Sequence, residues 1–103
     1  MITITPRAAE QIRTSAKQGN MIGMPLRIAC QKEADGSFHY ALGFDDQSQQ
    51  GDETYTSEGI DLVVGAISAP LLRGTIVDYV ELDEGKLEII FLNPNDPNYK
   101  PAD

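Results

Sequence analysis

The chain of 103 residues contains a single cysteine, Cys30, and no tryptophan. One cysteine excludes an intramolecular disulfide and any metal centre that takes several thiolates from one chain. The longest nearly apolar run, residues 62–72, holds 11 residues, whereas about 20 are needed to cross a bilayer. The chain starts without a basic leader and apolar segment of the kind that directs secretion. We therefore expect a cytoplasmic protein, and the length fits one domain.

Basic residues are also scarce. Lys and Arg number 8 against 16 Asp and Glu, which gives a net charge of −8. Residues 1–40 carry five bases and three acids (+2), and residues 41–103 carry three bases and thirteen acids (−10). The net negative charge repels polyanions, so we expect no nucleic-acid partner and no binding to an anionic membrane. The acids either confer solubility or attract a basic partner.

The familiar catalytic signatures are missing. There is no phosphate-binding loop, no Gly-x-Ser-x-Gly elbow, no His-Glu-x-x-His pair and no Cys-x-x-Cys pair. No nucleophile–base pair or metal triad can be assembled from the residues that remain. The sequence therefore predicts a protein that is not an enzyme and has no catalytic residue.

The chain instead shows the periodicity of a small α+β domain. Thr5-Pro6 opens an expected helix, and Gly19 is expected to end it in the left-handed conformation. Apolar residues then alternate along residues 26–31 and 38–44, with a turn at Asp35-Gly36, which predicts a β-hairpin. Further expected elements are strands at 54–56 and 60–64, a short helix at 68–72 and a hairpin at 75–92. We predict one β-rich domain over residues 1–95 and a flexible tail over 96–103.

Four residues are candidates for a functional role. Cys30 alternates with inward-facing residues and is expected to be a buried apolar side chain rather than a ligand. Asp35 could bind a hard cation or simply form the turn. His39 alternates with aromatic residues and is expected to be exposed, with a metal or acid–base role as the alternative. Tyr99 could anchor a partner or lie in a disordered tail.

Several short strings, taken in their order along the chain, resemble the A-type iron–sulfur carrier family (HesB/IscA-like). They are Ile4-Thr5-Pro6, Leu26-Arg27-Ile28, Gly74-Thr75 with Asp78-Tyr79-Val80, and Phe91-x-Asn93-Pro94-Asn95. The resemblance covers nearly the whole chain. It implies a β-sandwich-type core with one N-terminal helix and one short helix.

The family's thiolates are nevertheless missing. Carriers of this type place one cysteine in the first hairpin loop and a Cys-Gly-Cys near the C-terminus. The corresponding positions here are Asp35 and Lys100-Pro101-Ala102, and Cys30 falls on an ordinary strand position. Iron in such clusters is held by deprotonated sulfur. We therefore predict no metal-binding or cofactor-binding residue of the usual kind and no cofactor.

A closer likeness is to the cysteine-lacking DsrR branch of the family. It is based on Ala34-Asp35-Gly36-Ser37, Gly43-Phe44-Asp45-Asp46, Thr56-Ser57-Glu58-Gly59 and residues 91–101. This likeness implies an accessory protein of the dissimilatory sulfite reductase system of sulfur-oxidising bacteria.

Two functional hypotheses follow from these resemblances. The first is a cluster-free monomer that binds a protein of the sulfur-oxidation or iron–sulfur machinery, through the loop around Asp35 and the tail around Tyr99. The second is an iron or cluster carrier with unusual ligands. Those ligands would be Cys30 from two subunits, or Asp35 with His39.

Overall fold

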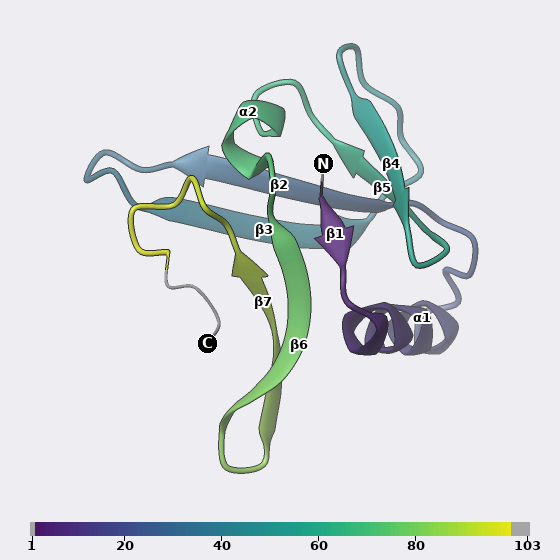
Figure 1. Ribbon diagram of the computed structural model, residues 1–103. Coiled ribbons are helices and arrows are strands. Elements are labelled where there is room, and N and C mark those ends of the chain that lie inside the picture. The colour runs from purple at the N-terminus through teal and green to yellow at the C-terminus, as the bar shows by residue number, and fades with distance from the viewer. Residues whose placement is uncertain (1, 100–103) are drawn as a thin grey trace.

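The computed structural model describes residues 2–99, which fold into two β-sheets and two helices (Figure 1). In chain order the elements are β1 (Thr3–Ile4), α1 (Pro6–Gln18), β2 (Leu26–Lys32), β3 (Phe38–Phe44), β4 (Glu53–Ser57), β5 (Ile60–Val64), α2 (Ala69–Leu72), β6 (Ile76–Asp83) and β7 (Lys86–Leu92). One sheet has the order β3-β2-β5-β4 and the other the order β1-β6-β7. The predicted small, β-rich α+β domain with two helices is confirmed.

Alternation along the strands builds the core between these layers. Leu26, Ile28 and Cys30 of β2 are at most 3% exposed, whereas the residues between them are half-buried. From α1 the core receives small side chains, Ala8 and Ala9 among them, which are fully buried. Small residues let the helix lie close to the sheet. In Figure 1, β6 and β7 cross the four-stranded sheet, and their hairpin continues well past β3.

Two details of the predicted elements differ. Gly19 follows α1 as expected, but its φ is −90°, and Asn20 is the residue in the left-handed region with a φ of 58°. Asparagine tolerates this conformation better than most residues because its short polar side chain can bond locally. β1 was not predicted from the sequence. It is two residues long and pairs in parallel with β6, Thr3 opposite Ile76 and Ile4 opposite Val77.

One ion cluster fixes the long β3–β4 connection to β2. Arg27 donates from Nε to Asp45 (2.7 Å) and from Nη1 and Nη2 to Asp52 (3.0 and 2.8 Å). The pKa of Asp45 is held below its ordinary value first by the Gln47 N–H and then by Arg27, and that of Asp52 is lowered mainly by Arg27. Within residues 2–99, no helix is long and apolar enough to span a bilayer.

Candidate functional site

The hairpin loop between β2 and β3 places Asp35 at the surface. Its Oδ1 accepts hydrogen bonds from the hydroxyl (2.6 Å) and the backbone N–H (2.9 Å) of Ser37. These two donors lower the pKa of Asp35. The carboxylate is therefore ionised, and one of its oxygens is engaged in forming its own turn.

Cys30 lies inside the molecule, where it is 3% exposed. Its N–H donates to Ser68 Oγ (3.0 Å), and that hydroxyl donates back to the Cys30 carbonyl (3.2 Å), which attaches the start of α2 to β2. Burial, with a smaller contribution from Asp96, raises the pKa of the thiol to about 11. The thiolate, which is the form that binds metal, is scarce at neutral pH.

The segment that follows β7 is bound to both β3 and α2. Tyr40 donates to Asp96 Oδ2 (2.7 Å) and accepts from Asn93 Nδ2 (3.2 Å), and its ring stacks on Phe91 with centroids 4.6 Å apart. Asn93 also donates to the Leu71 carbonyl (2.8 Å) at the end of α2. Burial, and then the bond to Asp96, raise the pKa of Tyr40. These contacts fix the chain up to residue 96.

Residues 96–99 continue in turns, with the N–H of Tyr99 donating to the Asp96 carbonyl (2.9 Å). Tyr99 is 39% exposed. The flexible tail proposed for residues 96–103 stays a prediction, and Lys100-Pro101-Ala102 lie outside the described residues. Whether Tyr99 and the Asp35 loop bind a partner also stays a prediction.

The structure does not gather the candidate residues into one centre. His39 is exposed on β3, whereas Cys30 is buried. Across residues 2–99 there is no cluster of three or more His, Cys, Asp or Glu side chains suited to a metal ion.

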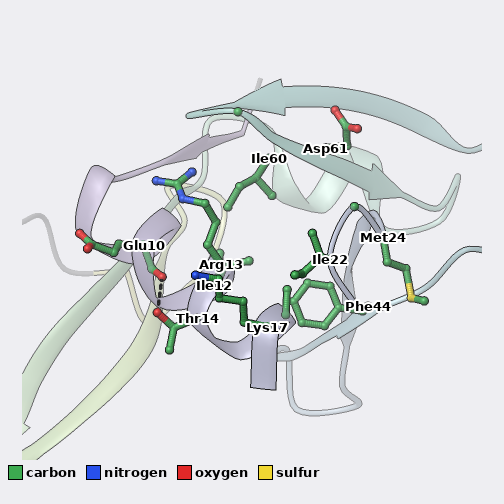
Figure 2. A pocket seen from close by; sticks show the side chains of 13 residues that line it. Glu10, Ile12, Arg13, Thr14, Lys17, Ile22, Met24, Phe44, Ile60 and Asp61 are labelled. Atoms are coloured by element: carbon green, nitrogen blue, oxygen red, sulfur yellow. Dashed lines mark hydrogen bonds between the residues drawn. The ribbon is translucent and has the colours of Figure 1, made fainter. Parts of the chain in front are cut away.

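One pocket, of about 460 Å³, was missed by the sequence reasoning (Figure 2). It opens between α1, residues 22–24 and the start of β5. Its lining is largely apolar and includes Ile12, Ile22, Met24, Phe44 and Ile60. On its rim, Arg13 Nη1 donates to the Glu58 carbonyl (2.8 Å), in a turn where Glu58 and Gly59 both have positive φ. The available signal was the apolar string Met21-Ile22-Gly23-Met24 in the connection between α1 and β2, where Ile22 is 72% exposed.

Comparison with known proteins identifies the family. Residues 1–101 match the model of the iron–sulphur cluster biosynthesis family, and the chain belongs to that family. It is 34% identical over 77 residues to a protein of Aquifex aeolicus, covering 75% of this chain and 66% of that one. It is 33% identical over 94 residues to the iron–sulfur cluster insertion protein ErpA of Photorhabdus laumondii, covering 91% and 81%.

Solved structures show the same fold. IscA crystallised with its 2Fe-2S cluster superposes with a TM-score of 0.76 at 31% identity, over 91% of this chain and 86% of that one. SufA of Escherichia coli superposes with a TM-score of 0.71 at 27% identity, with the same coverage.

The residues at the positions that the family resemblance assigns to thiolates lack the sulfur that an iron–sulfur cluster requires. Asp35 supplies a hard oxygen, and Lys100, Pro101 and Ala102 supply no sulfur. Cys30 is an inward-facing residue of β2 whose N–H is bonded to Ser68 at the start of α2.

Proposed function

We propose that this chain is a non-enzymatic, cluster-free accessory protein that binds a protein partner from the iron–sulfur or sulfur-oxidation machinery. The main supporting observation is the chemistry of its thiol. The single cysteine is 3% exposed, and burial raises its pKa to about 11. The loop position that would carry a ligand cysteine holds Asp35, hydrogen-bonded to Ser37.

A more specific proposal, on the location and pathway of the protein, follows from the resemblance to the DsrR branch. We place the protein in the cytoplasm of a sulfur-oxidising bacterium, as a monomer that supports the dissimilatory sulfite reductase system. The acidic surface and the absence of clustered bases support a protein partner rather than a nucleic acid.

Anaerobic incubation with ferrous iron and sulfide tests the cluster-free proposal. We expect the wild-type protein to stay colourless after desalting, with iron far below one atom per chain. Cys30→Ser and Asp35→Ala should be indistinguishable from it. Charge-transfer absorption that disappears in either variant would instead establish the alternative, a carrier with unusual ligands.

Binding to the purified proteins of the sulfite reductase system tests the pathway, and analytical ultracentrifugation tests the monomer. Saturable binding to one of these proteins by the iron-free chain is the expected result. If none of them binds while a cluster-assembly protein does, the placement in sulfur oxidation is wrong.

A further inference from the structure

We propose that the outer edge of β3 is a docking site for an extended, basic segment of a protein partner, which pairs with β3 as a fifth strand of that sheet. This inference rests on the proposed function, because it names the surface and the kind of partner through which an accessory protein would act.

The backbone of β3 supplies the first argument. Its inner edge pairs with β2, and the Glu33 N–H to Ser37 carbonyl bond (2.8 Å) and the Asp45 N–H to Pro25 carbonyl bond (2.9 Å) fix the register. Because hydrogen-bonded pairs alternate in an antiparallel ladder, the backbone groups of residues 39, 41 and 43 point to β2. Those of residues 38, 40, 42 and 44 point outward, and within the described chain no bond to them is found. Such a row of free donors and acceptors is a template for another strand.

The sequence of β3 supplies the second argument. The four strands at the edges of the described sheets are β1, β7, β3 and β4. β1 has only two residues, β7 carries Lys86 and Glu88, and β4 carries Glu53. β3 has seven residues, no Asp, Glu, Lys, Arg or proline, and an uninterrupted register with β2. Proteins usually protect long edge strands with charges, prolines or bulges, and β3 has none of these.

The β6–β7 hairpin, which extends past β3 (Figure 1), supplies the third argument, because it carries an exposed apolar side chain beside β3. Phe91, Ile89 and Leu87 alternate along one face of β7, and the first two pack on the core. Leu87 comes next on the same face, yet it is 56% exposed. It lines a groove with Leu42 of β3 and with Ile89. A strand added beside β3 would cover this groove with its inward-facing side chains.

The charge of the β6–β7 hairpin, whose Leu87 and Ile89 line the groove, indicates the chemistry of the partner segment. The acids Glu81, Asp83, Glu84 and Glu88 outnumber Lys86 in this hairpin. A segment that alternates apolar residues with Lys or Arg would match both the groove and this field. A second copy of the chain fits less well, because pairing two β3 strands would bring two such acidic hairpins together.

Hydrogen exchange in the isotope-labelled full-length protein tests this proposal. The probe is a blocked synthetic peptide of about nine residues, the length of a long strand, in which valine alternates with lysine or threonine. At saturation, exchange of the outward amides of Tyr40 and Leu42 should slow by about tenfold or more. The amides of Ala41 and Gly43, already bonded to β2, should change little. Equal slowing at all four, or at none, would overturn the proposal.

Leu42→Pro removes one outward N–H and leaves the ladder to β2 intact, because proline is tolerated on edge strands. Leu42→Ala is the matched control, because it shortens the side chain but keeps the N–H. We expect peptide binding to weaken more in the proline variant than in the alanine variant. The same peptide methylated on alternate backbone nitrogens requires no change in the protein and should not bind.

Undiminished binding of the methylated peptide would contradict strand addition. Equal binding of a peptide with glutamate in place of lysine would contradict the basic partner. If the outward amides become protected without peptide as the protein concentration rises, the occupant is a second copy of the chain. That result would contradict the proposal. Iron uptake is independent of all these results, so the proposed function and this docking site can fail separately.

Discussion

At the scale of single residues, Asp78 shows how one carboxylate joins three parts of the fold. Its Oδ1 accepts from Thr5 Oγ1 (2.7 Å), Arg7 Nε (2.8 Å) and the Tyr79 N–H (2.8 Å), and its Oδ2 accepts from Arg7 Nη2 (2.7 Å). Thr5 also caps α1 by accepting from the Ala8 N–H (3.2 Å). The start of the helix is thereby held on β6. The hydrogen bonds, those from Arg7 first, hold the pKa of Asp78 well below its usual range.

Asp78→Asn should therefore lower the free energy of unfolding by roughly 1–2 kcal/mol at pH 7, because bonds to a charged acceptor become bonds to a neutral one. A depressed folded-state pKa gives stability that is present above the unfolded value of about 4 and is lost as pH falls toward the folded value. The gap between wild type and variant, measured by urea unfolding, should narrow from pH 4 to pH 2. The control is Asp83→Asn, at an exposed residue. If the difference in unfolding free energy between wild type and Asp78→Asn stays constant with pH, the charge of Asp78 does not have the stabilising role assigned to it.

At the scale of elements, Asn93 joins the end of β7 to the end of α2. It is 1% exposed and donates to the Leu71 carbonyl and to Tyr40 Oη. Its Oδ1 accepts from the backbone N–H (2.9 Å) and the side chain (3.0 Å) of Asn95. Asn95 itself is exposed and donates to the Arg73 carbonyl (2.8 Å). The two asparagines thus satisfy the carbonyls of Leu71 and Arg73, in the last turn of α2 and directly after it.

We expect Asn93→Ala to lower the free energy of unfolding by about 2–3 kcal/mol, because it removes a buried amide group together with its four hydrogen bonds. Asn95→Ala should cost less than about 1 kcal/mol, because water can replace its bonds. Chemical denaturation of the two variants side by side measures the difference. If the two variants lose the same unfolding free energy, the burial of Asn93 does not determine how much its hydrogen bonds contribute to stability.

The regular elements were predictable because their signals are local. Alternation predicted β2 and β3, and Thr5-Pro6 predicted the start of α1. β1 was not predictable, since two residues carry no period and its pairing with β6 joins parts of the chain more than 70 residues apart. The position of Asn93 was missed for the same reason: its partners, Tyr40 and Leu71, are distant in sequence.

At the scale of the whole molecule, the fold of an iron–sulphur cluster biosynthesis family is present in a chain whose one cysteine is buried. IscA, whose fold matches at a TM-score of 0.76, was crystallised with a cluster. Here the burial of Cys30 agrees with its place in the alternation of β2, and the identity of Asp35 is visible in the sequence. The edge of β3 and the pocket beside α1 were not foreseen. Both depend on where the layers end, which alternation along one strand does not reveal.

If the absence of thiolates alone explains the proposed lack of a cluster, introducing them should produce iron binding. The combined variant Asp35→Cys, Lys100→Cys, Pro101→Gly and Ala102→Cys replaces the positions that the family resemblance assigns to its ligands. At the exposed Asp35 position an introduced thiol escapes the desolvation that raises the pKa of Cys30, so its thiolate is accessible to iron.

After anaerobic incubation with iron and sulfide, we expect this variant to gain charge-transfer absorption and bound iron that the wild type lacks. Adding Cys30→Ser should leave the gain unchanged, because that residue faces the core. Reverting residue 35 to Asp should reduce it, because a thiolate is replaced by a carboxylate. If the variant with all three cysteines folds, as judged by circular dichroism, and stays colourless, then the absence of sulfur ligands does not by itself explain the proposed lack of a cluster.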